Sequence, residues 1–492
     1  MSRPADPSES PPRTFTPPSS ILIVGAGVFG LGTAYALARR HHVFSDCSIT
    51  VLDRSTDPAV FPSRDASSVD SSRIIRADYA DPAYAALAAE AQAEWRKTGE
   101  DQLGGQGRYS ESGLVVVADK DPTQQPASSM PSSQPPITQK ITGVDYCWSS
   151  WENVLAMSKH DPALQNKIQL LPTQDAIRQA IGTGGVSGVW GYINRASGWA
   201  DADQSMRWLL RRAQDTGRIT FVSGTASFLT HVGNKITGVT LDDGRTMSAD
   251  LVILATGAWT GGLIDLYGRA VATAQTLAYL DITDEEQAAL ASQPVILNLS
   301  SGLFILPPRN NVLKVARHEH GYLNPTTTAR PLRRSLPAHR AEEESWPISL
   351  PPTNIEDAFL GIPERSKATL RQALKEMIPL PAIHDRPFKS TRVCWYTDTP
   401  TGDFLIDYHP DWDGLFIATG GSGHGFKFLP VLGERIVDCV VGDRPEVFKT
   451  KWAFTPTTSS SAQKAWNAIS TQDGSRAGEP GLIFADEMSN TT

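Results

Sequence analysis

Residues 21–40 read ILIVGAGVFGLGTAYALARR, and residues 49–54 read ITVLDR. The first four apolar residues predict a short buried strand, the glycine-rich turn at residues 25–30 follows at once, and the Ala/Leu-rich remainder predicts a helix. The second segment is rich in β-branched residues, so it predicts another strand, which stops at Asp53. This order of strand, GxGxxG turn, helix, strand and acid is typical of a Rossmann-type site for a dinucleotide.

The residues of the turn have different mechanical roles. Gly25 permits the tight turn, Gly27 lets backbone amides approach a pyrophosphate, and Gly30 lets the helix pack closely on the strand. Val28 and Phe29 open the helix, whose N-terminus offers free N–H groups and a partial positive charge to that anion. The turn is therefore expected to hold the phosphates of the dinucleotide.

Asp53, 23 residues after the last glycine of the motif, is placed to accept hydrogen bonds from a ribose hydroxyl, with Arg54 beside it. Two alternatives are a glycine-rich turn without a ligand and a membrane span, because residues 21–38 are uncharged over 18 positions. The second strand and its acid disfavour the first alternative. Four glycines in eight positions, with Arg39-Arg40 directly after the stretch, disfavour the second.

The length and composition are those of a multidomain globular protein. The 492 residues suffice for two or three domains at roughly 150 residues each, and the chain is 40% hydrophobic with 12 Trp and 16 Phe. The net charge of −8 argues against nucleic acid as a partner, because neutralising phosphates requires a basic surface. Residues 1–19 are polar and Pro-rich, so they predict a disordered tail rather than a secretion signal.

The four cysteines are widely spaced and form no CxxC pair, which indicates a reducing compartment and neither a disulfide framework nor a metal site. The last four residues, SNTT, are not a peroxisomal S-K-L signal. We therefore expect a cytoplasmic protein that does not associate with membranes and is a monomer or a small homo-oligomer.

Nucleotide-type elements recur in three separated parts of the chain, so the binding domain is expected to be discontinuous. A nicotinamide dehydrogenase more often has one continuous Rossmann half per nucleotide, and the interleaving therefore favours a flavoprotein. The expected fold class is α/β with two domains, one a Rossmann-type FAD-binding domain and the other a substrate domain with an antiparallel or mixed sheet. The predicted ranges are 20–80, 200–268 and 388–445 for the FAD-binding domain, 81–199 and 269–387 for the substrate domain, 446–492 for a C-terminal extension, and 121–137 for a low-complexity insertion.

Four sequence islands resemble one family, the flavin-dependent amine oxidases that include monomeric sarcosine oxidase, pipecolate and saccharopine oxidases, and fungal fructosyl amino acid oxidases (amadoriases). The similarity runs over most of residues 20–442, and the closest subgroup is the fungal members of comparable length. The islands are VGAGVFGLGTAYALA (24–38), SSRIIRADYAD (71–81), TRVCWYTDTPTGDFLIDYHP (391–410) and ATGGSGHGFKFLP (418–430).

The resemblance implies FAD attached covalently through a cysteine thioether, and Cys394 stands at the matching position. Without the resemblance, a small buried cysteine beside an aromatic strand would be favoured, and Cys47, Cys147 and Cys439 keep that interpretation. A glycine loop before a helix can also bring amides to the flavin ring and stabilise negative charge on the reduced flavin. The other expected cofactor contacts are Ser72, Arg73, Ala226, Gly257, Tyr396, Gly421, Gly423, His424, Gly425 and Lys427.

The resemblance implies that Arg76 and Lys427 hold a substrate carboxylate. An Arg fork suits bidentate recognition and Lys adds a compact charge. A surface or flavin-phosphate contact is the alternative for Arg76.

Lys314 lies inside an apolar strand pattern and matches the family lysine that promotes O2 reduction; the alternative is an exposed Lys on an edge strand. His318 matches a neighbour of the substrate in sarcosine oxidase, although a lone His is more often structural.

Two differences from the family leave the substrate open. The paired tyrosines that precede the oxygen-site lysine in sarcosine oxidase are replaced by residues 302–305, GLFI, and the GHSFK of fructosyl amino acid oxidases is GHGFK here. The expected function is FAD-dependent oxidation of a secondary amine that carries a carboxylate, to an imine, with O2 reduced to H2O2. The alternatives are capture of the imine in a ring closure, deglycation of fructosyl amino acids, a dehydrogenase with another electron carrier, and a flavin-binding sensor without turnover.

Overall fold

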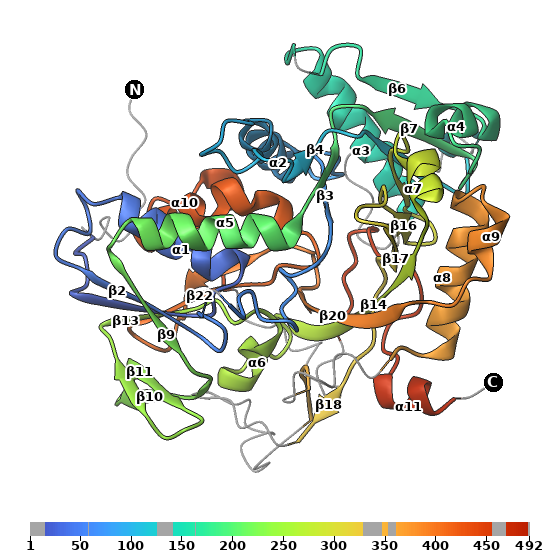
Figure 1. Cartoon of the computed structure of the whole chain (residues 1–492). Coiled ribbons are helices and arrows are strands. Elements are labelled where there is room, and N and C mark those ends of the chain that lie inside the picture. The colour runs from blue at the N-terminus through green and yellow to red at the C-terminus, as the bar shows by residue number, and fades with distance from the viewer. Residues whose placement is uncertain are drawn as a thin grey trace, which may run out of the picture.

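The computed structural model describes residues 15–57, 59–124, 141–162, 164–327, 347–352, 361–454 and 469–490. Two large β-sheets organise the chain, which passes between them several times (Figure 1). Most of the tail predicted at residues 1–19 and of the insertion predicted at residues 121–137 lies outside the described residues.

The first sheet has six strands, and the motif at residues 21–54 forms its centre. β1 (Ser20–Val24) pairs in parallel with β2 (Ser48–Asp53) on one side and with β13 (Leu251–Leu254) on the other. A parallel sheet is covered on both faces, which explains why β1 and β13 are apolar and buried almost throughout. The strand order is β21 (Leu405–Tyr408), β22 (Leu415–Thr419), β13, β1, β2 and β9 (Ile219–Ser223), with β21 alone antiparallel.

Helices cover one face of this sheet, and a small sheet covers the other (Figure 1). The helices are α1 (Val28–Arg39), α5 (Ala202–Asp215) and α10 (Leu429–Val440). A Cβ on Gly433 would lie 2.1 Å from the Gly32 carbonyl oxygen, so the two glycines let α1 and α10 touch backbone to backbone. The small antiparallel sheet contains β10 (Ala226–Val232), β11 (Lys235–Leu241) and β12 (Thr246–Ser248).

The second large sheet has eight strands and is mixed. Most neighbouring strands in this sheet pair antiparallel, but β15 (Val295–Asn298) and β5 (Leu114–Ala118) pair in parallel. The helices α3 (Gly143–Ser158), α4 (Gln174–Ile181) and α8 (Glu364–Met377) pack on it. The strand order is β20 (Ser390–Asp398), β14 (Val271–Asp281), β17 (Val312–Arg317), β16 (Leu303–Ile305), β15 (Val295–Asn298), β5 (Leu114–Ala118), β7 (Trp190–Asn194) and β6 (Ile168–Leu171).

The predicted α/β fold with two sheets is confirmed, but the sequence misplaced β20. Residues 388–445 are predicted to belong to the FAD-binding domain, whereas all nine residues of β20 pair with β14 in the eight-stranded sheet. The chain therefore returns to the six-stranded sheet after Asp398 and not at residue 388. The β-branched and aromatic residues of β20 predict a strand but do not specify its partner, which is β14. The remaining domain boundaries stay predictions.

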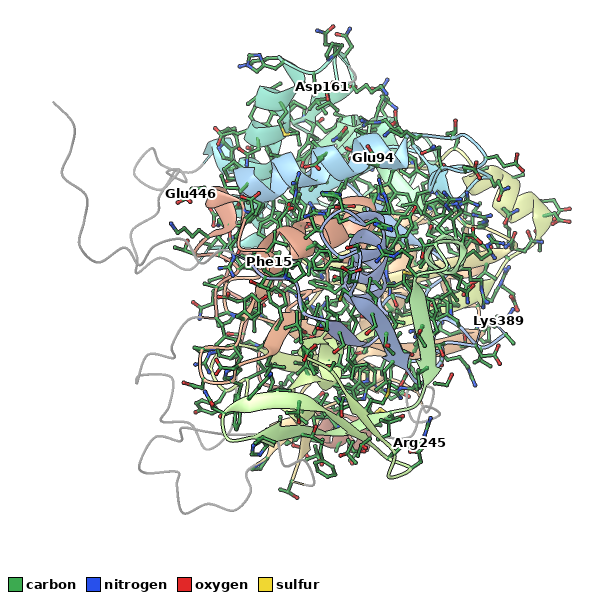
Figure 2. All side chains as sticks on the ribbon, turned by 90° about the vertical axis from the view of Figure 1, so that its left-hand side faces the viewer. Phe15, Glu94, Asp161, Arg245, Lys389 and Glu446 are labelled. Atoms are coloured by element: carbon green, nitrogen blue, oxygen red, sulfur yellow. The ribbon has the colours of Figure 1, made fainter. Side chains whose placement is uncertain are left out.

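The described C-terminal residues pack against the rest of the folded chain. Ala477 forms a bridge with Glu319, Leu323 bridges Ile483, and α11 (Phe484–Ser489) reaches α8. Figure 2, turned by 90° from Figure 1, shows charged side chains such as Arg245 and Lys389 at the outer edge of the molecule. In the described part of the chain, no helix combines the length and the apolar character that crossing a bilayer requires.

Candidate active site

A cavity of about 590 Å³ lies where the two large sheets meet. On one side it is bounded by the carboxyl ends of β1, β2, β13 and β22, where ligands bind in open α/β sheets. On the other side β16, β17 and β20 contribute Phe304, Lys314 and Tyr396. The cavity thus extends from the glycine turn to the eight-stranded sheet.

In the turn at residues 25–30, Gly25 and Gly30 leave no room for a side chain, whereas Gly27 does. Gly25 has φ +104°, and a Cβ there would lie 2.4 Å from the Ala255 carbonyl oxygen. A Cβ on Gly30 would lie 1.8 Å from the Gly25 carbonyl oxygen, so the start of α1 packs directly on the turn after β1. At Gly27 the nearest atom to such a Cβ is Ser68 Oγ at 4.0 Å. Space is therefore left at the position predicted to face a pyrophosphate.

Asp53 fastens this turn to β2 and lines the cavity. Its Oδ2 accepts a hydrogen bond from the Ala26 amide at 2.8 Å, and its Oδ1 accepts one from the Ser55 amide at 2.9 Å. Burial outweighs these bonds and raises the pKa of the carboxyl above its ordinary value. Each carboxylate oxygen can accept a further bond, as the predicted contact with a ribose hydroxyl requires.

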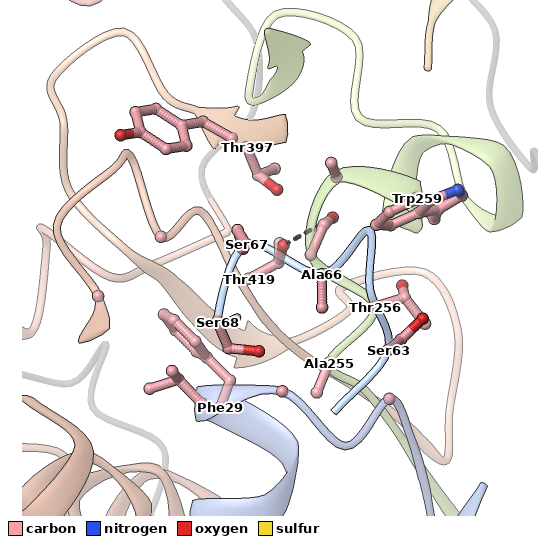
Figure 3. Close-up of a pocket in the computed structure, with 18 of the residues that line it drawn as sticks. Phe29, Ser63, Ala66, Ser67, Ser68, Ala255, Thr256, Trp259, Thr397 and Thr419 are labelled. Atoms are coloured by element: carbon pink, nitrogen blue, oxygen red, sulfur yellow. Dashed lines mark hydrogen bonds between the residues drawn. The ribbon is translucent and has the colours of Figure 1, made fainter. Parts of the chain in front are cut away.

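At this end the cavity is lined by Phe29 and Arg54, which were predicted, and by Asp65, Thr256, Trp259 and serines of the loop after β2, which were not. The Arg54 guanidinium stacks on the Trp259 ring at 4.7 Å and pairs with Asp65 at 2.9 Å. Figure 3 shows the loop residues Ser63, Ala66, Ser67 and Ser68 together with Thr256, Trp259 and Phe29 around the cavity. The Ser/Asp-rich loop after β2 reads like any surface loop, so the sequence carried no signal for these contacts.

A buried carboxylate, Asp70, organises the opposite end of the cavity. Its side chain is 0% exposed, and Lys314 Nζ donates to its Oδ2 at 2.6 Å. Arg73 Nη1 also bonds to Oδ2, and Tyr279 Oη donates to Oδ1 at 2.8 Å. The β14–β17 register places Tyr279 opposite Lys314, which is why both reach the same carboxylate. Lys314 also donates to the Ser72 carbonyl at 2.8 Å.

The charged side chains around Asp70 shift one another's pKa values. Burial alone would raise the pKa of Asp70, but the neighbouring Arg73 and Lys314 charges outweigh it and hold that pKa far below its ordinary value. Burial lowers the pKa of Lys314 to about 8, with the Asp70 charge opposing the decrease. Asp70 is therefore ionised at neutral pH, and Lys314 is largely protonated. Lys314 is buried, so the alternative of an exposed lysine is wrong.

Cys394 lies immediately behind the cavity wall. Arg392, Cys394 and Tyr396 alternate along β20 and share one face. The thiol packs with Leu277 and Ala316 and accepts a hydrogen bond from Arg73 Nη2 at 3.5 Å. Arg73 thus connects this thiol to the Asp70 carboxylate.

A directed hydrogen-bond chain surrounds Lys427. His424 Nε2 lies 2.8 Å from the Gly402 carbonyl and must donate to it, so Nδ1 is the acceptor. Tyr79 Oη therefore donates to His424 Nδ1 at 2.9 Å and accepts from Lys427 Nζ at 2.9 Å. Burial lowers the pKa of Lys427 well below its ordinary value, and the nearby Arg76 charge lowers it further. The protein thus fixes Lys427 but gives it no acidic hydrogen-bond partner among the described residues.

Arg76 lies beside Lys427 and also lines the cavity. Its guanidinium is over the rings of Tyr79 and Tyr146, at 5.0 and 6.0 Å. Its Nη1 is buried and has no hydrogen-bond partner among the described residues. The nearby Asp78 carboxylate is instead engaged by Asn194 and Ser197. An unpaired buried donor costs about 1–3 kcal/mol, so an anionic occupant is favoured here. The location rules out the surface alternative for Arg76.

His318 and Arg476 complete this end of the cavity. His318 lines the cavity, and its Nδ1 lies 3.3 Å from Arg476 Nη1. Arg476 belongs to the C-terminal segment that the sequence analysis treated as a weakly patterned extension. No local motif marks it, because its partners lie far away in the sequence.

A protein-family model described as FAD dependent oxidoreductase matches residues 20–439. The chain belongs to this family. It is 32% identical over 468 residues to the amino acid oxidase imqH of Aspergillus flavus, which covers 86% of this chain and 93% of the relative. It is 28% identical over 462 residues to the L-saccharopine oxidase of Schizosaccharomyces pombe, covering 92% and 96%.

The solved structures agree with this assignment. The fructosamine oxidase Amadoriase II from Aspergillus fumigatus superposes with a TM-score of 0.73 at 26% identity, over 96% of both chains. The resemblance to the sarcosine oxidase and amadoriase group is confirmed, and the protein is an FAD-dependent oxidase of that group.

The cavity of this oxidoreductase fits FAD. Residues 25–30 are open at Gly27 for a pyrophosphate, Asp53 has free acceptor capacity for a ribose, and residues 421–427 would face the flavin ring. Of the predicted site residues, Gly30, Ser72 and Cys394 do not line the cavity. Gly30 packs helix on strand as expected, whereas Ser72 and Cys394 lie behind Lys314 and Tyr396. The predicted residues that do line it are Gly25, Gly27, Val28, Phe29, Asp53, Arg54, Arg73, Arg76, Ala226, Gly257, Lys314, His318, Tyr396, Gly421, Gly423, His424, Gly425 and Lys427.

Proposed function

We propose that this enzyme oxidises a secondary amine that carries a carboxylate. The observation that carries the proposal is the pair of buried cations, Arg76 and Lys427, which line the cavity without an acidic hydrogen-bond partner among the described residues. Two such charges strongly favour a bound anion. Several relatives are named for secondary-amine amino acids, among them the L-saccharopine oxidase of Schizosaccharomyces pombe and the monomeric sarcosine oxidase of Bacillus.

Arg76 and Lys427 also influence the protonation state of the substrate nitrogen. They attract the carboxylate and disfavour a second positive charge, so the amine is bound preferentially in its neutral form, which can give up a hydride. Bound FAD would supply the hydride acceptor and the route by which the electrons reach O2. The protein's part is to hold the amino acid in a fixed orientation, which the Lys427–Tyr79–His424 chain supports by limiting the motion of Lys427.

Replacing Arg76 or Lys427 with methionine is expected to lower kcat/KM by about 10- to 150-fold, because each loses a charge-assisted hydrogen bond of about 1.5–3 kcal/mol. Stopped-flow bleaching of the flavin and release of H2O2 would be measured with sarcosine, L-pipecolate, L-saccharopine and N-methyl-L-tryptophan. Lys389→Met, which removes an exposed lysine outside the cavity, is the matched control. Unchanged kinetics in both cavity variants would contradict the proposal.

The fate of the imine distinguishes two versions of the reaction. It can be hydrolysed, or it can be captured by a nucleophile of the same molecule in a ring closure, and product mass spectra separate the two. Deglycation of a fructosyl amino acid is a second candidate, supported by the fold match to Amadoriase II. A fructosyl amino acid in the same substrate panel tests it directly.

We further propose that Lys314 assists the reaction with O2, since its charge lines the flavin end of the cavity. Its loss of a proton is then expected to slow reoxidation. The charge is present below a pKa of about 8 and is lost above it, so the reoxidation rate should fall as the pH rises through about 8.

Asp70→Asn should move this decline to lower pH. The Asp70 charge raises the pKa of Lys314, and removing it leaves burial and Arg73, which both lower that pKa. We expect a displacement of about one to three pH units in stopped-flow reoxidation of the reduced enzyme. Asp201→Asn alters a carboxylate that caps α5 and pairs with Arg309 away from the cavity, and should leave the profile in place. A profile unchanged in Asp70→Asn would refute this role of Asp70.

A further inference from the structure

Arg476 is a buried cation of the C-terminal segment, with a side chain that is 1% exposed. Its Nη2 donates to Asp398 Oδ1 at 2.5 Å and to the Ser422 carbonyl at 2.9 Å. Its Nη1 donates to the Glu319 carbonyl at 3.2 Å and contacts His318 Nδ1 at 3.3 Å. The Arg476 guanidinium therefore links three segments: the glycine loop that contains Ser422, the end of β20 at Asp398, and residues 318–319 after β17.

The direction of the bond to His318 is fixed by chemistry. A guanidinium has five N–H donors and no acceptor, so His318 Nδ1 must be the acceptor. A neutral imidazole with an accepting Nδ1 carries its hydrogen on Nε2. His318 Nε2 has no hydrogen-bond partner within the described chain and is not a fully buried atom, and the residue lines the cavity. Its N–H is thus available to a ligand.

The surroundings of His318 also oppose a second proton. Burial lowers its pKa well below the ordinary value, and the charges of Arg476, Arg76 and Lys427 lower it further, as does His424. The adjacent carboxylate of Glu319 bonds instead to Arg317 at 2.7 Å, and the Tyr396 ring lies 6.1 Å away. No acidic side chain in the described part of the structure hydrogen-bonds the imidazole.

We propose that Arg476 is a positioning residue that fixes His318 as a neutral imidazole with its hydrogen on Nε2, a donor to the substrate carboxylate. The idea rests on the proposed function for the identity of the acceptor, but the state of His318 itself does not depend on substrate. Arg476 also tethers the Ser422 carbonyl, so the same side chain holds the glycine loop and the donor in one arrangement.

A second arginine provides a control that separates positioning of His318 from simple attachment of the C-terminal segment. Arg365 on α8 holds the same segment through surface pairs with Glu479 at 3.5 Å and Glu487 at 3.4 Å. Arg365→Gln weakens this attachment without touching His318. Arg476→Gln removes the attachment and replaces the cationic donor to Nδ1 with a shorter, neutral amide, and Arg476→Lys keeps a cationic donor.

The first test needs no substrate. Histidine-selective ¹⁵N NMR of the FAD-loaded protein, with His318→Gln identifying the signal, should show a neutral Nε2–H imidazole from about pH 5.5 to 8. In Arg476→Gln the signal should become a mixture of tautomers or titrate within that range, and in Arg365→Gln it should not change. An Nδ1–H imidazole in the unmodified protein, or an unchanged signal in Arg476→Gln, would overturn the proposal.

The second test is a double-mutant cycle on flavin reduction by the best substrate of the panel. We expect kcat/KM to fall about tenfold in Arg476→Gln, to recover partly in Arg476→Lys, and to change little when Arg476→Gln is added to His318→Gln. If Arg476→Gln lowers kcat/KM equally in the presence and in the absence of His318, Arg476 only anchors the C-terminal segment. A protein that oxidises no member of the panel but shows the Nε2–H signal would contradict the proposed function and leave the assignment of His318 intact.

Discussion

Replacing Cys394 with alanine is expected to release the flavin from the polypeptide. Acid precipitation should leave the yellow colour with the unmodified protein and move it to the supernatant in Cys394→Ala, and the intact mass should fall by one flavin. The reason is that Cys394 stands at the position where the resemblance implies a thioether to the flavin, and its thiol packs beside Tyr396, which lines the cavity.

The control uses a second buried cysteine. Cys439 lies in α10 outside the cavity, so Cys439→Ala should keep the flavin in the pellet. Free flavin in the supernatant of the unmodified protein would remove Cys394 from the cofactor chemistry. It would leave the FAD-dependent family assignment unaffected, since that rests on the match over residues 20–439.

Lys314→Met is expected to slow reoxidation of the reduced flavin by O2 by about 10²- to 10³-fold, the usual effect of removing one preorganised electrostatic group. Reduction by substrate under anaerobic conditions should change far less, because Arg76 and Lys427 are intact. The variant should fold, because Asp70 keeps its bonds to Arg73 and Tyr279. Stopped-flow measurement of the two half-reactions separates these effects.

Lys314→Arg tests whether charge alone suffices. Arginine stays protonated at all relevant pH values, so this variant should retain part of the reoxidation rate and lose the decline near pH 8. Equal reoxidation rates in Lys314→Met and the unmodified enzyme would show that Lys314 does not assist the reaction with O2. Fast reduction of an artificial dye combined with slow use of O2 in the unmodified enzyme would favour the dehydrogenase alternative.

The nucleotide end of the site was predictable from a short stretch of sequence. The strand, turn and helix around Gly25, Gly27 and Gly30 form a contiguous motif, although the close contact at Gly25 is with Ala255 on the neighbouring strand segment. Asp53 follows from the same pattern, because it ends the adjacent parallel strand. The resemblance added Lys314, Arg76 and the Cys394 position, which no periodicity indicates.

Only the tertiary structure showed what these residues contact. Asp70 and Lys314 are 244 positions apart, and Arg476 and His318 are 158 apart. Strand alternation could have placed Arg392 on the same face as Cys394, but no sequence signal connects a C-terminal arginine to a histidine after β17.

The sequence by itself determined the Rossmann turn, the α/β class and the family, because each depends on contiguous motifs whose geometry is nearly independent of the rest of the chain. The tertiary structure alone decided which sheet holds β20, which charges are buried together, and which nitrogen of His318 can carry a hydrogen. Those outcomes depend on strand register and on desolvation, and both arise only when distant segments pack against one another.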